Sequence, residues 1–355
     1  VAISAAIGLG IMVGSFRHTV FYWLEQQLWA DIYVAPPGNS RHLDKVLLPE
    51  SIEILEKAEG VAHLTRNRRI QVKTSGTEID LLTLDLPEEG YASYSFKDAI
   101  EDPWDSFDTK HSIVISEPLS NRLVLSIGDK LTLLSPRGDT IFEIKGVFYD
   151  YSSERGHAII HRNHLEKFWK DTRVNSVALY LEDGWTPELF QSAFEQLYIP
   201  QPLIIRSNVN LRQVSLEIFD RTFAITGVLQ ILVTGVAFIG VISSLMALQL
   251  ERQRELGILR ATGMTPGQIW RLVTSQCGLM GIVAGVLAIP VGIMMAIVLI
   301  FVINQRSFGW TFPTLIESSV LLNNMMLAVF AALLAGLYPA VKMSRVPPAL
   351  VLREE

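Results

Sequence analysis

The stretch ERQRELGILRATGMTPGQIWR, residues 251–271, places a cluster of charged side chains between two long apolar segments. The apolar segments are residues 223–250 and 272–303, and neither contains Asp, Glu, Lys, Arg or His. Each is longer than the roughly 20 residues that cross a bilayer as a helix. We therefore predict two membrane-spanning helices joined by a short charged element.

Two further apolar segments lie at the ends of the chain, at residues 1–16 and 319–341. The first begins at Val1, already inside the apolar run, so we expect the sequence to start part-way into a membrane helix. A cleaved signal peptide is the alternative, but no small-residue cleavage site follows the run. The sequence thus predicts four membrane helices, the first of them truncated.

The arginines predict the orientation of these helices. Arg252, Arg254, Arg260 and Arg271 lie in the 250–271 loop, whereas the 304–318 loop has Arg306 alone. By the positive-inside rule the first loop is cytoplasmic, which places residues 31–215 outside the cytoplasm. Aromatic side chains near the outer boundary are expected at the lipid interface: Phe21, Tyr22, Trp23, Phe308, Trp310 and Phe312. The chain is then a multi-pass protein of the inner or plasma membrane with a large extracytoplasmic domain.

Composition agrees with a mixed membrane and soluble protein, because 49% of the residues are hydrophobic and the mean hydropathy is +0.31. Residues 31–215 hold 28 acidic and 20 basic side chains, a net charge of −8 within a total of −6. Such a surface argues against a nucleic-acid partner, which needs clustered Lys and Arg. Cys277 is the only cysteine, so no disulfide forms within the chain.

The extracytoplasmic block mixes strand and helix patterns. Residues 111–119, 129–135, 140–150 and 174–183 have strand character, and PRGD at 136–139 predicts a hairpin turn. Residues 49–60 and 186–197 are typical of helices. The predicted fold class is an α-helical membrane domain of four helices with an α+β extracytoplasmic domain inserted between the first and second.

Helical spacing continues past the bilayer at both ends of that domain, in residues 18–30 and 211–223. We expect two stalks there, although amphipathic helices lying on the lipid surface remain an alternative. The expected boundaries are 1–30 for helix one and stalk, 31–210 for the outer domain, 211–250 for stalk and helix two, 251–271 for a cytoplasmic elbow, 272–303 for helix three, 304–318 for an outer loop, 319–341 for helix four and 342–355 for a cytoplasmic tail.

The absence of ionisable side chains from the last three apolar segments argues against an ion-driven transporter or channel, which needs such groups at membrane depth. Small residues at helical spacing favour close helix packing instead, either within the chain or between subunits. The expected packing residues are Gly281, Gly285, Gly292, Ala328, Ala332 and Gly336.

Motifs for catalysis are missing from the sequence: it contains no GxxxxGK[ST], no HExxH and no GxSxG. His157, His161 and His164 could in principle hold zinc, but they are spread along a strand and a helix start. The acidic run at 101–108 lacks calcium-loop spacing and is expected to be a solvated loop. We expect no enzyme activity and no metal.

The charged element has the pattern of an ordered elbow. Residues 251–261 favour a helix, Gly263 is placed to end it, and Thr265 with Gln268 predicts a capping box that starts the next helix. An ordered helix end with apolar residues among its charges suggests a protein partner. A topology anchor that only fixes orientation is the alternative, and the physical pattern does not separate the two.

Residues 251–276 resemble the signature of FtsX-like permeases, the group of ABC transporters that includes MacB and the lipoprotein-release (Lol) proteins. The tail at 338–355 resembles their C-terminal pattern, and ISEPLSNRLVLSIGDKLTLLSPRGD (115–139) lies in a stretch similar to their periplasmic core domain. The resemblance covers nearly the whole chain. The stretch YDYSSERG (149–156) is similar to large permeases that carry this unit twice, so the chain is expected to be half of a tandem protein or one member of a homodimer.

The resemblance implies a permease subunit that contacts a cytoplasmic ABC ATPase, binds no cofactor of its own because ATP is held by that partner, and passes motion to the outer domain by mechanotransmission. The cargo would be a lipid, lipoprotein or peptide-like substrate, and the other partners a second permease unit and membrane lipids. The implied ATPase-coupling residues are Glu251, Arg252, Arg254, Glu255, Leu256, Gly257, Ile258, Arg260, Ala261, Thr262, Gly263 and Met264.

Three other functions stay open at this point. An FtsX-type regulator would activate a cell-wall hydrolase and transport nothing. A membrane-anchored sensor would use the acidic outer domain as a ligand binder and need no ATPase. A membrane enzyme would depend on the histidine cluster.

Overall fold

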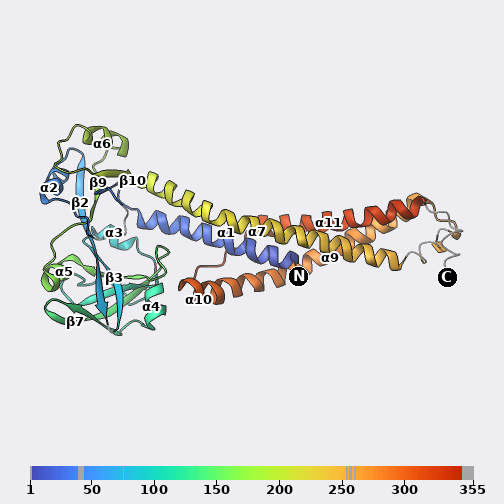
Figure 1. Ribbon diagram of the computed structural model, residues 1–355, viewed down its shortest axis with the longest axis horizontal. Helices are drawn as coiled ribbons and strands as arrows, with labels where there is room; N and C mark the ends of the chain where they lie inside the picture. The colour runs from blue at the N-terminus through green and yellow to red at the C-terminus, as the bar shows by residue number, and fades with distance from the viewer. Residues whose placement is uncertain are drawn as a thin grey trace. The chain divides into compact units, whose positions relative to one another are not determined.

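A computed structural model describes residues 2–38, 44–74, 76–252, 255, 258–259 and 261–345 (Figure 1). The chain divides into two compact units. The membrane unit comprises Val1–His18, Phe219–Ile303 and Phe312–Glu355, and the outer unit comprises Thr19–Ile218 and Asn304–Thr311.

Among the described residues, four helices are long and apolar enough to cross a membrane, as predicted. They belong to α1 (Ala2–Gln27), α7 (Asn208–Glu251), α9 (Pro266–Val298) and α11 (Ser318–Arg345). A π-helical segment, η1 (Leu299–Asn304), and a short helix, α10 (Gln305–Phe308), extend α9 toward the outer loop. Helix therefore continues to Phe308, five residues beyond the predicted end at 303.

The two predicted stalks are continuous with membrane helices. Helix α1 runs unbroken for 26 residues and α7 for 44 residues. At about 1.5 Å per residue, α7 alone is roughly 66 Å long, well beyond the ~30 Å of hydrocarbon in a bilayer. A separate helix lying flat on the lipid would need a break in the backbone, and neither helix has one.

The outer unit is built on a ten-stranded mixed sheet in the order β10-β1-β9-β2-β3-β8-β5-β7-β4, with β6 paired to β7. Most pairs are antiparallel, but β3–β8 and β5–β7 are parallel. The strands are β1 (Ile32–Ala35), β2 (Val61–Thr74), β3 (Thr77–Leu84), β4 (Phe96–Ala99), β5 (Ser112–Ser116), β6 (Lys130–Ser135), β7 (Gly138–Phe148), β8 (His157–His161), β9 (Ser176–Leu181) and β10 (Ile204–Ser207). Five helices accompany them: α2 (Pro49–Glu56), α3 (Glu88–Ala92), α4 (Glu117–Leu123), α5 (Arg162–Trp169) and α6 (Pro187–Phe194).

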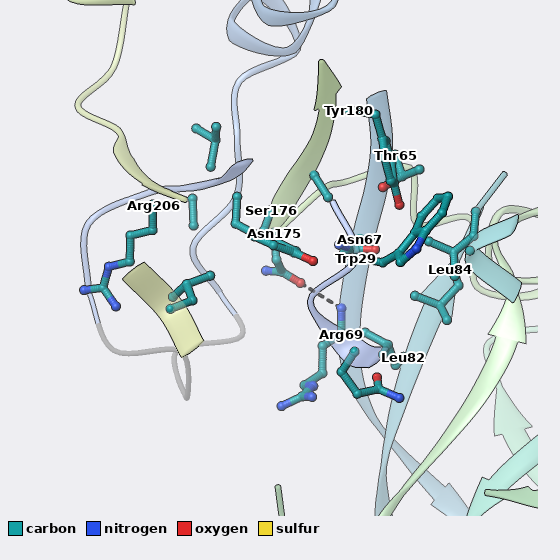
Figure 2. A pocket seen from close by; sticks show the side chains of 18 of the residues that line it. Trp29, Thr65, Asn67, Arg69, Leu82, Leu84, Asn175, Ser176, Tyr180 and Arg206 are labelled. Carbon is teal, nitrogen blue, oxygen red and sulfur yellow. Dashed lines mark hydrogen bonds between the residues drawn. The ribbon is translucent and has the colours of Figure 1, made fainter. Parts of the chain in front are cut away.

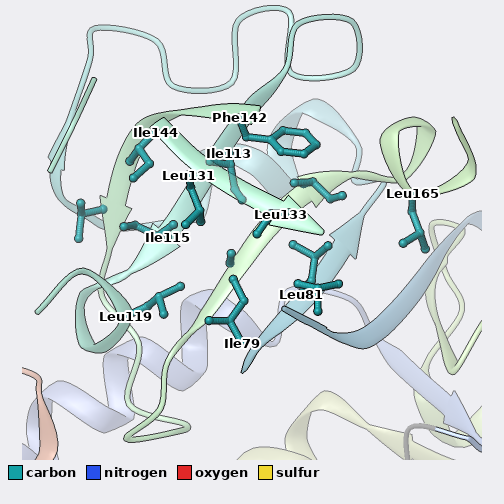
Figure 3. Close-up of a cluster of buried hydrophobic side chains, with 14 residues drawn as sticks. Ile79, Leu81, Ile113, Ile115, Leu119, Leu131, Leu133, Phe142, Ile144 and Leu165 are labelled. Carbon is teal, nitrogen blue, oxygen red and sulfur yellow. The ribbon is translucent and has the colours of Figure 1, made fainter. Parts of the chain in front are cut away.

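Two apolar cores divide this unit into lobes. In the first lobe, buried residues of β1, β9 and the start of β2 pack with α2 and α6, around Leu55, Leu179 and Phe190. In the second lobe, β3, β5, β6, β7 and β8 enclose a larger core around Leu81, Ile113, Leu133 and Phe142 (Figure 3). Strand β2 belongs to both, because residues 61–67 pair with β9 and residues 68–74 pair with β3.

Several predicted elements of this unit are confirmed. Strands β6 and β9 and helices α2 and α6 lie within their predicted ranges. Strand β7 overlaps its predicted range. The PRGD turn is a two-residue hairpin in which Ser135 pairs with Gly138.

The strand predicted at 111–119 is wrong beyond Ser116. Helix α4 begins at Glu117, with Ser116 at its N-cap and a proline in its first turn. Proline has no N–H to donate to a strand ladder but fits the first turn of a helix, so Pro118 ends the strand and starts the helix.

Candidate functional site

The cytoplasmic elbow is the first candidate site. Thr262 donates its hydroxyl hydrogen to the carbonyl of Leu259 at 2.9 Å, and Met264 N donates to the same carbonyl at 3.1 Å. Gly263 has φ +110°, in the left-handed region that glycine adopts at low cost, so it ends the helix as predicted. Four of the predicted coupling residues, Arg254, Leu256, Gly257 and Arg260, lie outside the described residues.

The start of α9 holds the other side of the elbow. Thr265 Oγ1 accepts from Gln268 N at 3.4 Å, and Thr265 N donates to Gln268 Oε1 at 2.9 Å. The predicted capping box is therefore confirmed, with Pro266 in the first turn. The two reciprocal bonds satisfy backbone donors that would otherwise be free at a helix start.

The described side chains of the elbow differ in how far they are exposed to solvent. Ile258 and Leu259 are 48% and 38% exposed, so they leave an apolar patch open beside Glu251, Arg252 and Glu255. Ala261, Thr262 and Gly263 are exposed as well. Met264, in contrast, packs against the buried cluster of Ile269, Val273 and Cys277. Ile258 and Leu259 are thus the large apolar side chains exposed in the described part of the elbow before Met264, and Met264 packs the elbow against α9.

The six predicted packing residues lie at helix contacts inside the membrane unit. A Cβ added to Gly281 would stand 2.7 Å from the Cβ of Ala332, and one added to Gly336 would stand 2.7 Å from Cys277 Sγ. Gly292 approaches Ile7 of α1 in the same way, and Gly285 lies beside Met325 and Ala328. The helix faces that carry these small residues therefore pack against other helices of the same chain. The apolar span of α7, by comparison, has none of its described residues buried.

Helices α1 and α7 are joined by polar and aromatic contacts in each unit. In the membrane unit, Arg17 makes a bidentate ion pair with Asp220 at 2.8 and 3.1 Å, next to a contact between Phe16 and Phe219. In the outer unit, Arg212 of α7 donates to the carbonyl of Leu28 at 3.0 Å, just beyond the end of α1.

The second candidate site is a loop contact inside the outer unit that the sequence analysis missed. Glu117 is fully buried at the start of α4. Its carboxylate accepts from Thr311 N at 3.0 Å, from Thr311 Oγ1 at 2.8 Å and from Lys97 Nζ at 2.6 Å. The outer loop between α10 and α11 is thus bound to a helix that directly follows strand β5.

Neighbouring side chains extend this contact. Asn121 Nδ2 donates to the carbonyl of Gly309 at 2.6 Å, and the Tyr151 hydroxyl donates to the carbonyl of Thr311 at 3.1 Å. The ring of Tyr151 lies between Trp310 at 6.0 Å and Trp23 of α1 at 5.8 Å. Burial, with the charge of Glu117 next, raises the pKa of Tyr151, so this phenol stays protonated and able to donate.

The aromatic residues of the outer loop therefore differ from the predicted lipid-interface belt. Trp310 is only 8% exposed because it packs against Tyr151, and Phe312 is 2% exposed against Phe16 in the membrane unit. Phe308 alone among the three is an exposed side chain. One signal in the sequence could have indicated the contact: the run SEPLSNRL (116–123), which has a capping residue, an acidic residue and proline at a helix start.

The three histidines do not meet around a point. His157 Nδ1 lies 3.2 Å from Asp150 Oδ2, His161 Nε2 lies 3.8 Å from Asp85 Oδ1, and His164 Nε2 is 3.1 Å from the carbonyl of Phe107. Burial lowers the pKa of His161 and of His164. Among the described residues no group of three His, Cys, Asp or Glu side chains is placed to hold a metal ion.

Comparison with known proteins agrees with these features. Residues 1–197 match the MacB-like periplasmic core domain, and residues 227–348 match the FtsX-like permease C-terminal family. An uncharacterized ABC transporter permease protein of Mycobacterium tuberculosis is 37% identical across 100% of this chain, which spans 42% of that protein. The lipoprotein-releasing system transmembrane protein LolC of Haemophilus influenzae is 23% identical over 68% of this chain and 64% of its own length.

Among solved structures, the periplasmic region of MacB from Actinobacillus actinomycetemcomitans is similar, with 12% identity and a TM-score of 0.39 over 54% of this chain and 94% of that one. The chain spans about two fifths of the M. tuberculosis permease and about two thirds of LolC. The family and the four membrane helices make this a multi-pass protein of the inner or plasma membrane. The chain belongs to the ABC transporter permeases of the FtsX, MacB and Lol type.

Proposed function

We propose that this chain couples ATP hydrolysis by a separate cytoplasmic ABC ATPase to movement of its outer unit. Membership of the permease family implies an ATPase partner. The chain has no phosphate-binding loop, so in this proposal it binds no cofactor itself and catalyses no reaction.

The elbow supports the position of the ATPase contact. Its helix end and the next helix start are held by the Thr262 and Thr265 hydrogen bonds, which fix the direction of the exposed Ile258 and Leu259. A rigid, partly apolar protrusion is suited to a groove on a protein partner, because little conformational entropy is lost on binding.

The observation that carries the proposal is the Glu117 contact. The outer loop continues directly from α10 and leads into α11, and Glu117 binds this loop from the start of α4. A displacement of the loop must either break a buried, charge-assisted contact or move α4 with it. Moving α4 also moves β5, to which α4 is joined without an intervening residue.

In the proposal the cargo is a lipid, lipoprotein or peptide-like molecule handled on the outer side of the membrane. The apolar spans carry no ionisable side chain that would line a hydrophilic path, which favours handling outside the bilayer core. The exposed span of α7 would face membrane lipids or a second permease unit, either a second copy or the other half of a tandem chain.

The test is co-purification of an ABC ATPase from native membranes in mild detergent. Ile258→Asp places a charge in the exposed patch of the elbow and should abolish recovery of the ATPase. Leu189→Asp changes an equally apolar residue, 55% exposed, in the outer unit and should leave recovery unchanged. If the ATPase is recovered with both variants, the exposed patch of the elbow does not form the ATPase contact.

The result also separates the alternatives. A membrane-anchored sensor needs no ATPase. If no ATPase is recovered with the unmodified chain, the result favours the sensor over the permease. An FtsX-type regulator would recover an ATPase but show ATP-dependent activation of a cell-wall hydrolase instead of loss of a cargo from the membrane.

A further inference from the structure

A cavity of about 460 Å³ opens on one face of the sheet in the first lobe of the outer unit (Figure 2). Its floor is formed by strands β1, β2, β3, β9 and β10, and its rim includes Trp29 just after α1 and Leu211 in α7. The volume lies in the range of about 300–1,000 Å³ that is typical of small-molecule sites. No role follows for this cavity from the elbow or from the Glu117 contact.

The alternation of side chains along the strands explains why polar side chains of β2 reach the cavity. Thr65, Asn67 and Arg69 of β2 face the cavity, while Leu64, which precedes Thr65, and Val177 and Leu179 of β9 face the core under α2 and α6. One face of this sheet is therefore closed by apolar packing, and the other stays open.

Three cationic side chains line the cavity, and the described lining includes no Asp or Glu. They are Lys45, Arg69 and Arg206, in an outer block whose net charge is −8. Within the described part of the chain, neither guanidinium group has an acidic side chain recorded at ion-pair distance. The cavity thus concentrates positive charge against the sign of its surroundings, which attracts an anion.

Asn175 brings two of these cations together. Its Oδ1 accepts from Arg69 N at 2.9 Å, and its Nδ2 donates to the carbonyl of Lys45 at 2.7 Å. One side chain therefore holds the backbone of both residues at a single end of β9. Such fixed positions lower the entropy cost of binding an anion between them.

Aromatic and aliphatic side chains form the rest of the cavity. The rings of Trp29 and Tyr180 lie 5.6 Å apart between centroids, with Leu82 and Leu84 on the neighbouring strand β3. Figure 2 shows Trp29 and Leu84 toward the right of the view, Arg206 toward the left and Arg69 between them. Burial raises the pKa of Tyr180, so its hydroxyl adds no negative charge to the cavity.

We propose that this cavity binds an anionic amphiphile, with a phosphate or carboxylate headgroup at Arg69 and Lys45, which Asn175 joins, and its hydrocarbon part against Trp29, Tyr180 and Leu84. Guanidinium and ammonium groups bind such headgroups through charge-assisted hydrogen bonds, and the apolar lining removes hydrocarbon from water. The inference names a substrate class for the proposed permease and in that respect rests on the proposed function.

A single lipid-like molecule fits the cavity better than an acidic peptide does. The site combines three cations with a confined apolar lining, whereas an acidic peptide needs an extended row of cations and leaves the aromatic surface uncovered. The rim residues Trp29 and Leu211 belong to or directly follow helices that continue into membrane spans. Membrane lipids are amphiphiles that such a protein can reach directly.

The experiment uses the full chain in phosphatidylcholine nanodiscs with a photoreactive lauroyl lysophosphatidate, and cross-linked peptides are identified by mass spectrometry. A second probe has the same tail and a zwitterionic choline headgroup. The variant Arg69→Gln/Arg206→Gln removes two cations, and Arg137→Gln, an exposed arginine of the β6–β7 turn, is the matched control. Equal thermal unfolding of the variants establishes that each is folded.

The expected result is labelling of β2 and β9 peptides by the anionic probe and little labelling by the choline probe. The double variant should need roughly tenfold more probe for half-maximal labelling, since the lost charge-assisted bond from Arg69 contributes about one power of ten and Arg206 contributes only a more distant charge. Arg137→Gln should match the unmodified chain. Competition by laurate as well as by lysophosphatidate would assign the site to any anionic headgroup, and competition by lysophosphatidate alone would assign it to phosphate lipids.

Three results would overturn the inference: equal labelling by both probes, no effect of the double variant, or full competition by inorganic phosphate, which would indicate a simple anion site. Labelling blocked by a glutamate-rich peptide but not by unlabelled lysophosphatidate would identify a peptide site instead. ATPase co-purification is measured on the same samples. Recovery of the ATPase without cavity labelling refutes the cavity inference alone, and labelling without an ATPase refutes the proposed coupling alone.

Discussion

Glu117 is the residue on which the contact between the outer loop and the outer unit depends. Its fully buried carboxylate is shared by Lys97 and Thr311, which lie 20 residues before it and 194 residues after it in the chain. A buried charge is stable only when it is paired, so each of these partners requires the others.

Replacing this carboxylate by Glu117→Ala should lower the free energy of unfolding by about 2 kcal/mol, because Lys97 and Thr311 lose a charged hydrogen-bond partner. Amide exchange at residues 309–311 should also become faster. Both can be measured by denaturant unfolding and hydrogen exchange. Glu154→Ala, at an exposed acidic residue, is the control and should change neither. Unchanged exchange in the loop would mean that other contacts hold it.

Asp171 joins two segments of the outer unit through contacts with the buried Arg68 and the exposed Arg173. Its Oδ2 accepts from Arg68 NH2 at 2.9 Å and from Arg173 NH2 at 2.8 Å. Burial by itself raises the pKa of this carboxyl, but the hydrogen bonds from Arg173 and Arg68 outweigh it and lower the pKa to about 2.

A carboxyl group whose pKa is lower in the folded state stabilises the fold above its unfolded pKa near 4, and this contribution disappears as the pH falls toward 2. Asp171→Asn should therefore cost about 2 kcal/mol at pH 7. The difference in unfolding free energy between this variant and the unmodified chain should shrink below pH 4. Asp183→Asn, in an exposed turn, should show no such pH-dependent difference. A constant difference from pH 7 to 2 would exclude this role for Asp171.

At the scale of elements, the sequence was most informative where one residue type fixes the local geometry. Thr265, Pro266 and Gln268 determine a capping box from three neighbouring positions, and Gly263 determines the end of the preceding helix. Long uncharged runs identify membrane helices for a similar reason, since no soluble alternative buries them. These predictions depended on local chemistry alone.

Strand β2, which has no regular apolar pattern of its own, was not found. Strand β2 carries Arg66, Arg68 and Arg69 on a run that lacks a simple alternation of apolar residues. It is a strand because β9 and β3 pair with its two halves, and neither pairing is visible from its own residues. The Glu117 contact was missed on the same grounds, because it joins residues 194 apart in the chain.

The α9–α11 packing gives a prediction for an element. Gly281→Leu should destabilise the membrane unit by about 2 kcal/mol, since even a Cβ at this position would stand 2.7 Å from Ala332 and 3.1 Å from the backbone of Val329. Ala284→Leu is the control, because Ala284 is exposed on the same helix. Thermal unfolding in detergent, followed by fluorescence, measures both. Equal melting temperatures would show that the two helices can separate to admit the larger side chain.

At the scale of the whole molecule, the elbow and the Glu117 contact should be separable in function. Glu117→Ala should retain the ATPase in co-purification, since the elbow is unchanged, and yet lose most of the transport or release that depends on ATP. Ile258→Asp should lose the ATPase itself. ATP hydrolysis and substrate release measured in proteoliposomes distinguish them. If Glu117→Ala retains full release, the outer loop does not transmit the motion.

Strand β2 also limits how the outer unit can deform. It pairs with β9 in the first lobe and with β3 in the second, and its 14 residues extend for about 46 Å at roughly 3.3 Å each. A hinge between the lobes would bend β2 between Asn67 and Arg68, where its pairing changes from β9 to β3, and would strain the contacts of Arg68 with Asp171 and Asn175. In the proposed coupling, these contacts of Arg68 would resist bending between the lobes, so a push delivered at α4 would displace the rim of the cavity together with the rest of the outer unit.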